Sequence, residues 1–157
     1  MFKIFELIDG FIGWANQLGR GEREPFGVLI LSCGGIGDTV LFSHVLPHFV
    51  ELATPGEPVS LLLRQDGAKV SFLIPKEVTV LSIDFKRLAK NLLYRKKIMK
   101  MLFDKEYRLV ITTDYLRHPN LDEALIRACQ APQNFAMTPR PWAKYQARLD
   151  NNSKYFS

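Results

Sequence analysis

The chain has 157 residues, of which 47% are hydrophobic and 24% charged, a composition typical of a single globular domain and not of a disordered segment. No apolar run approaches the ~18 residues that a membrane-spanning helix needs, and the first residues lack the features of a secretory signal. We therefore expect a cytoplasmic protein whose two cysteines, Cys33 and Cys129, are reduced thiols. The formal net charge of +5 directs attention to anionic partners.

The first 25 residues are expected to form an amphipathic helix and a linker. Apolar residues recur at helical spacing over residues 1–18, and glycine, proline and charges of both signs follow over residues 19–25. Such a helix either packs on the domain or lies at a membrane interface, and we expect packing.

The most informative segment begins at residue 28. An apolar run, Val28 to Leu31, predicts a buried parallel strand, and three glycines follow within four positions (Gly34, Gly35 and Gly37). Asp38 comes next and opens an apolar-periodic segment predicted to be helical from there to Leu52. This order places a carboxylate at the carboxyl end of a parallel strand, where open α/β sheets bind ligands.

Two interpretations of Asp38 are open. Aspartate is a favoured helix cap, so the residue has a purely structural explanation as well as a catalytic one. The glycine pattern matches neither the dinucleotide-binding fingerprint nor the P-loop, which argues against a phosphate cradle. Beside this turn, Cys33 is either a small packing residue, the interpretation we favour, or a nucleophile.

Further strands and helices alternate along the chain. Apolar runs predict strands, and periodic segments between them predict helices. The expected strands span residues 59–63, 78–83, 109–112 and 135–137, and the expected helices span residues 66–73, 85–103 and 121–129. The alternation predicts right-handed βαβ units, hence an α/β, Rossmann-like parallel sheet flanked by helices over residues 26–137.

The helix expected over residues 85–103 is strongly basic. It carries seven basic residues and no acid, with apolar residues on one face: Lys86, Arg87, Lys90, Arg95, Lys96, Lys97 and Lys100 are the basic ones. One interpretation is an ordinary solvated face. The other is contact with an anionic membrane surface or a phosphorylated lipid or sugar. We expect no nucleic-acid binding, because aromatic residues do not interleave with the basic ones.

Charged residues also follow the other predicted strands. Arg64 follows the second strand, and Asp114 and Arg117 follow the fourth. The arginines either bind an anionic ligand such as a phosphorylated sugar or are surface cations. Asp114 either binds a sugar hydroxyl or caps a turn. The remaining residues, 138–157, are polar and predict no further element, so we expect a tail or the start of an interdomain segment.

Three segments in order resemble the heptosyltransferase family, glycosyltransferase family 9. They are Val28-Leu-Ile-Leu-Ser-Cys-Gly-Gly-Ile-Gly-Asp38-Thr-Val-Leu-Phe-Ser, Tyr107-Arg-Leu-Val-Ile-Thr-Thr-Asp114 and Ala124-Leu-Ile-Arg-Ala-Cys-Gln-Ala-Pro132. The resemblance implies the N-terminal, acceptor-side half of a two-domain GT-B fold. It also implies that Asp38 is the general base of an inverting sugar transfer that needs no metal and no cofactor.

In this family a second domain binds the nucleotide-sugar donor, so we expect these residues alone to be inactive and to need a donor domain, continuous or in trans. The expected acceptor is an anionic surface glycan or a lipopolysaccharide-type glycolipid. It would be bound by Gly34, Gly35, Gly37, Arg64, Asp114 and Arg117, with peripheral membrane contact through residues 85–103. The alternative is a non-catalytic binding module for an anionic glycan or lipid.

Overall fold

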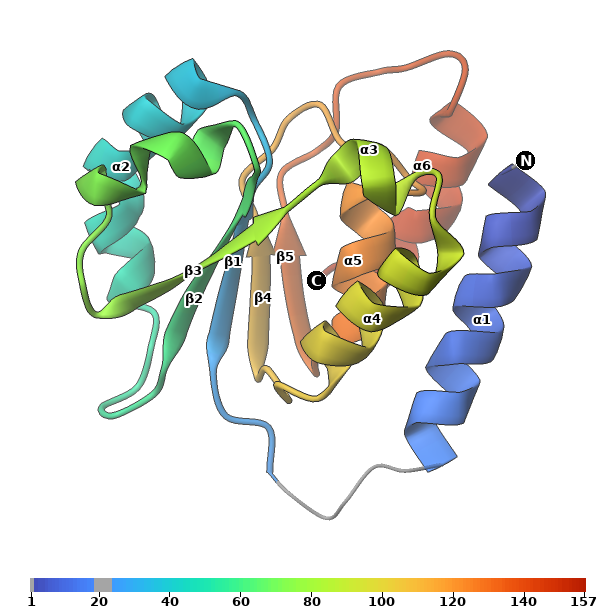
Figure 1. Ribbon diagram of the computed structural model, residues 1–157, viewed down its shortest axis with the longest axis horizontal. Helices are drawn as coiled ribbons and strands as arrows, with labels where there is room; N and C mark the ends of the chain where they lie inside the picture. Colours follow the sequence, from blue (N-terminus) through green and yellow to red (C-terminus); the bar gives the residue numbers. More distant parts are fainter. Residues whose placement is uncertain (1, 19–23) are drawn as a thin grey trace.

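The computed structural model describes residues 2–18 and 24–157, and at its centre is a five-stranded parallel sheet. The strand order is β3-β2-β1-β4-β5, and all four pairings are parallel. The strands are β1 (Val28–Ser32), β2 (Val59–Arg64), β3 (Val78–Ile83), β4 (Leu109–Thr112) and β5 (Gln133–Ala136). The predicted α/β Rossmann-like fold is thus confirmed (Figure 1).

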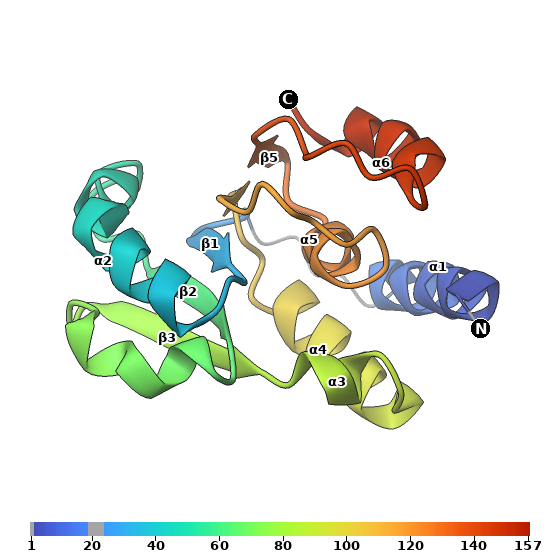
Figure 2. The same ribbon diagram turned by 90° about the horizontal axis from the view of Figure 1, so that it is seen from above.

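Helices cover both faces of the sheet (Figures 1 and 2). One face packs against α2 and the 3₁₀ segment η1, and the other packs against α4 and α5. Their bounds are α2 (Ile36–Val50), η1 (Gly67–Leu73), α3 (Phe85–Leu88), α4 (Leu92–Phe103) and α5 (Asp122–Cys129). Successive side chains of β1 point to opposite faces of the sheet, so this strand contributes to the hydrophobic core on each face. Val28 and Ile30 belong to one core cluster, and Leu29 and Leu31 belong to the other.

The N-terminal helix α1 (Phe2–Leu18) lies outside α4 and α5 as a further layer. Phe5 and Ile12 are buried, and Ile12 packs with Met99 of α4. The expectation that this helix packs on the domain is confirmed, while residues 19–23 of the expected linker lie outside the described residues. No helix among the described residues is both long and apolar enough to cross a membrane.

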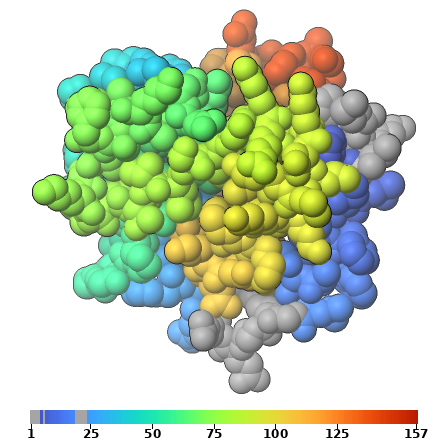
Figure 3. All heavy atoms as spheres, in the orientation of Figure 1, coloured from blue at the N-terminus to red at the C-terminus, as the bar shows by residue number. Residues whose placement is uncertain are grey.

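The prediction of a single basic helix over residues 85–103 is wrong in two respects. It is divided into α3 and α4, because the side chain of Asn91 accepts a hydrogen bond from the amide of Tyr94 at 2.8 Å and begins a new helix. Moreover, Arg95 is buried and does not belong to the basic face. The six other basic side chains are exposed, and the yellow-green side chains of this segment project from the surface in Figure 3.

The last twenty residues contain regular structure, contrary to expectation. They form α6 (Gln146–Asn152) and the 3₁₀ turn η2 (Ser153–Tyr155). Tyr145 and Leu149 are buried, and the Asn152 side-chain amide donates a 2.6 Å hydrogen bond to Glu123 of α5. The segment looked like a tail because its few buried side chains contact residues that are distant in sequence.

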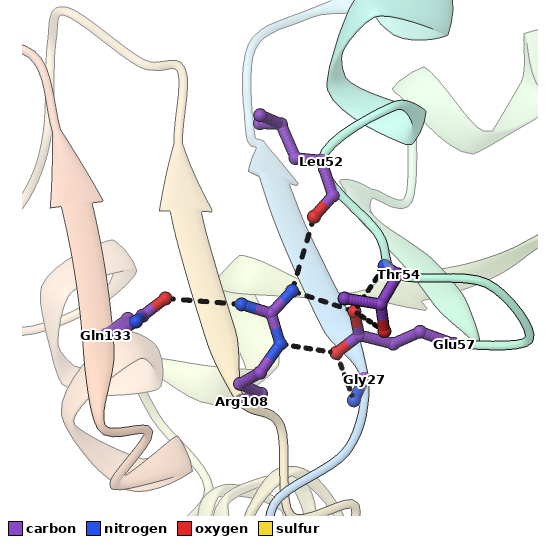
Figure 4. Close-up of polar contacts among 6 residues, drawn as sticks. All are labelled: Gly27, Leu52, Thr54, Glu57, Arg108 and Gln133. Carbon is purple, nitrogen blue, oxygen red and sulfur yellow. Dashed lines mark hydrogen bonds and ion pairs between the residues drawn. The ribbon is translucent and has the colours of Figure 1, made fainter.

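An ion pair between a half-buried arginine and a buried glutamate joins three segments at the amino-terminal end of the sheet (Figure 4). Arg108, before β4, donates two hydrogen bonds to Glu57, at 2.8 and 2.7 Å. Glu57 also accepts from the amides of Gly27, before β1, and Thr54. The Arg108 guanidinium, together with these amides, lowers the pKa of Glu57 from 4.5 to about 2, against the opposing effect of burial.

We expect Glu57→Gln to reduce the free energy of unfolding by about 3 kcal/mol at neutral pH. The unfolded chain protonates Glu57 before the folded chain does, so the stabilisation is present above pH 4.5 and is lost as the pH falls through about 2. Urea unfolding of both proteins between pH 2 and 7 should therefore give curves that converge in acid. Glu77→Gln, an exposed glutamate just before β3, is the matched control and should change stability by less than about 0.5 kcal/mol. If the free energies of unfolding of the parent and of Glu57→Gln differ by the same amount at every pH in this range, the stabilisation does not come from the ionised Glu57 carboxylate.

Candidate functional site

A cleft of about 700 Å³ opens at the carboxyl-terminal ends of β1 and β4. The chain places β2 on one side of β1 and β4 on the other, so the strand order reverses at this point. Open α/β sheets bind ligands in this position because loops from the two neighbouring strands diverge there. The polar side chains that line the cleft include Asp38, Arg64, Asp114 and Arg140.

Asp38 lies in the first turn of α2 and both caps the helix and faces the cleft. Its Oδ2 accepts a 2.8 Å hydrogen bond from the Gly35 amide, and its side chain is exposed. A Cβ on Gly34 would lie 2.4 Å from the Asp38 Cβ, so a glycine is required for this arrangement. Among the described residues, only Oδ2 of this carboxylate is hydrogen-bonded, and Oδ1 has no hydrogen-bond partner. The structural interpretation of Asp38 therefore holds without excluding the catalytic one.

Asp114 supplies a second carboxylate from the turn after β4. Its Oδ2 accepts a 2.7 Å hydrogen bond from the amide of Cys33, which ties the turn after β4 to the turn after β1. Burial raises the pKa of Asp114, and the charge of Asp38 contributes in the same direction. The two carboxylates are thus close enough to interact inside one cleft.

Behind Asp114 lies a buried cluster that the sequence analysis missed. The side-chain ligand atoms of Cys33, Asp114 and Asp122 lie within 4.8 Å of one another, a set of groups that could hold a divalent cation. Asp122 begins α5, and its Oδ2 accepts a 2.6 Å hydrogen bond from the amide of His118. Burial raises the pKa of Asp122 to about 7. The sequence contained a signal for this residue, because the segment with Asp122 follows β4, and the ends of β4 and β1 meet at the edge of the sheet where Asp38 lies.

The same surroundings decide between the interpretations of Cys33. Burial, followed by the charges of Asp122 and Asp114, raises the pKa of its thiol well above the ordinary value. A thiol held in its protonated form is a poor nucleophile. The structure therefore favours Cys33 as a packing residue, which it also is in the core cluster beneath α4 and α5.

Two arginines lie at the rim of the cleft. Arg64, at the end of β2, is exposed and forms an ion pair with Asp66 at 3.1 Å. Arg140 comes from the segment before α6, where its backbone amide donates a 2.8 Å hydrogen bond to the carbonyl of Tyr115. Arg64 was predicted and Arg140 was not, because a non-local contact brings the latter to the cleft. Two guanidinium groups give the rim the donor geometry that phosphate and carboxylate groups require.

Two predicted ligand-binding residues do not line the cleft. Arg117 is buried, with its Nε 3.2 Å from Glu123, another guanidinium nitrogen bonded to the Met137 carbonyl and the ring of Phe156 stacked 5.0 Å away. Arg117 was therefore wrongly predicted to bind a ligand, because its guanidinium group joins α5 to the C-terminal segment. Gly37 is exposed on α2, and a Cβ there would meet no atom within 4 Å.

The cleft therefore has groups suited to proton transfer and groups suited to binding an anion. A carboxylate on a rigid strand-to-helix turn can accept a proton from a bound hydroxyl, and the arginines can bind an anionic group of the same ligand. Comparisons of the chain with protein-family models, with curated proteins and with solved structures find no match.

Proposed function

We propose that this chain is the acceptor-binding half of an inverting glycosyltransferase of the heptosyltransferase type. The acceptor would be a surface-glycan or lipopolysaccharide-type molecule, and a separate donor domain would bind the nucleotide sugar on the cytoplasmic side of the membrane. The observation that carries the proposal is the Asp38 carboxylate, fixed by the Gly35 amide at the mouth of the cleft.

The arrangement suits the removal of a proton from an acceptor hydroxyl. The hydrogen bond from Gly35 restricts the orientation of the Asp38 side chain, and this side chain is exposed. A base held in this way can accept the hydroxyl proton as the acceptor oxygen attacks the anomeric carbon of the donor sugar. The bond from that carbon to the nucleoside diphosphate breaks in the same displacement, so the nucleoside diphosphate leaves and the carbon is inverted.

The arginines explain which acceptor the cleft would select. Arg64 and Arg140 approach the cleft from the end of β2 and from the segment before α6. A phosphorylated sugar would engage these guanidinium groups, and its hydroxyl groups would lie toward Asp38 and Asp114.

A second candidate, a non-catalytic module that binds an anionic glycan, is favoured by one observation. The capping hydrogen bond of Asp38 accounts for this residue without any catalytic role. Both the transferase and the non-catalytic module would bind an anionic glycan, and only the transferase would catalyse a reaction. A binding experiment therefore tests the ligand that the two candidates share.

We expect a phosphorylated hexose to bind in the cleft, and Arg64→Gln or Arg140→Gln to weaken its binding about tenfold, as for the loss of one charge-assisted hydrogen bond. Chemical shifts of the backbone amides of residues 33–38, followed by NMR during titration, locate the ligand and give its affinity. Lys76→Gln removes an exposed cation before β3 and is the matched control. Shift changes elsewhere, or equal weakening by all three substitutions, would contradict the proposed site.

A further inference from the structure

The outer face of α1 is an apolar stripe without a partner among the described residues. Its members recur at intervals of four, three and four residues, so they share one side of the helix. They are Leu7, Phe11, Trp14 and Leu18, with exposed fractions of 76%, 65%, 57% and 72%. The opposite side carries the buried Phe5 and Ile12, so the domain core leaves most of this stripe exposed to solvent.

A basic corner lies next to this stripe. The turn between α3 and α4 is beside α1 in both ribbon views (Figures 1 and 2), and α4 contacts α1 through the Arg95–Asp9 ion pair. The corner exposes two leucines, Leu92 at 45% and Leu93 at 81%. The same two helices and the turn between them carry six exposed basic residues: Lys86, Arg87, Lys90, Lys96, Lys97 and Lys100.

The acidic residues of this corner leave most of its charge uncompensated. Asp104 forms an ion pair with Lys100 at 2.8 Å, and Asp84 accepts a hydrogen bond from the backbone amide of Arg87 at the start of α3. No other carboxylate occurs in residues 84–104. The corner therefore has a strongly positive potential beside an apolar stripe that contains a tryptophan and a phenylalanine.

We propose that the α1 stripe and the α3–α4 corner together form a docking surface for an anionic lipid bilayer. The apolar side chains would enter the boundary between headgroups and acyl chains, with α1 parallel to the membrane plane, and the lysines would contact anionic headgroups. Tryptophan suits this boundary because its ring is apolar and its N–H is polar.

Charge argues against a second copy of the chain as the occupant. A symmetric dimer formed through the whole of this surface would place two basic corners of the same charge at one interface, which is costly. A bilayer with anionic headgroups satisfies the stripe and the corner at once. This surface is separate from the cleft, and the inference does not depend on which ligand the cleft binds.

The test uses Trp14 as a fluorescent reporter. The chain has two tryptophans, so Trp142→Phe leaves Trp14 alone. We expect its emission to shift to shorter wavelength with vesicles of phosphatidylcholine and phosphatidylglycerol, and much less with phosphatidylcholine alone. Added salt should weaken binding, because the headgroup contacts are screened.

Substitutions separate the apolar contribution of the α1 stripe from the electrostatic contribution of the α3–α4 corner, in a sedimentation assay with the same vesicles. Phe11→Ser with Leu18→Ser should lower the bound fraction at least tenfold, since both side chains would leave the acyl boundary. Lys96→Gln with Lys97→Gln should lower it about tenfold or more. Phe72→Ser, an 80% exposed phenylalanine of η1 on the other face of the sheet, is the matched control and should bind as the parent does.

Three results would overturn the inference. Unchanged Trp14 emission with anionic vesicles, for a protein whose circular dichroism shows it folded, excludes insertion of the stripe. Equal losses from Phe72→Ser and Phe11→Ser would indicate nonspecific adsorption. A dimer in sedimentation equilibrium that Phe11→Ser dissociates would identify a second copy as the occupant.

Discussion

Replacing Asp38 with asparagine is expected to slow sugar transfer by roughly 10²- to 10⁴-fold, the usual contribution of a general base. Asparagine retains a side-chain oxygen that can accept the Gly35 hydrogen bond, so α2 should keep its first turn. The acceptor affinity should change by less than about threefold, because the substitution removes the base and not the arginines. The measurements are the transfer rate in the presence of a donor-binding domain and the affinity for the acceptor by calorimetry.

Asp114→Asn is the informative comparison, because this second carboxylate lines the same cleft. Its Oδ2 is bound to the Cys33 amide and burial raises its pKa, so we assign it a positioning role. A larger rate loss for Asp114→Asn than for Asp38→Asn would make Asp114 the base. If Asp38→Asn weakens binding and transfer equally, the residue is structural, and the non-catalytic module becomes the better description.

Replacing Arg95 with methionine is expected to reduce the free energy of unfolding by about 3–5 kcal/mol, the cost of breaking a buried ion pair. The Arg95 side chain is 1% exposed and that of its partner Asp9 is 12% exposed. Its Nε donates to Asp9 at 2.7 Å and an Nη donates to the Asn120 carbonyl at 2.9 Å. Methionine fills similar space but leaves the Asp9 carboxylate and this carbonyl without their donors.

Lys97→Met makes a comparable change on an exposed position of the same helix, and it should alter stability by less than about 0.5 kcal/mol. Chemical denaturation of both variants gives the comparison. A double-mutant cycle with Asp9→Asn isolates the pair itself. If Arg95→Met and Lys97→Met destabilise equally, α1 is not held to the domain by this ion pair.

The sheet was predictable because its signal is local. β1, β2 and β4 are short apolar runs that are almost entirely buried in the structure, and runs of four to six such residues between turns are typical of buried parallel strands. The position of Asp38 followed from the same local logic, since the carboxyl end of a strand fixes where the next residues lie. β5 was displaced by two residues at its start, because only one of its four residues has an apolar side chain larger than alanine.

Tertiary contacts decided the roles of the charged residues. Arg64, Arg95, Arg117 and Arg140 are chemically identical in the sequence, yet Arg64 and Arg140 line the cleft while Arg95 and Arg117 are buried in ion pairs. Arg95 pairs with Asp9, which is 86 residues away in the sequence, and Arg117 pairs with Glu123.

The sequence by itself determined the alternation of strands and helices, and the carboxylate at the first strand-to-helix turn. The tertiary structure alone decided that Arg140 reaches the rim of the cleft and that α1 presents its apolar stripe outward. The reason is physical: hydrophobic periodicity is set by neighbours along the chain. The energy of a buried charge or an exposed apolar face depends on segments that only folding brings together.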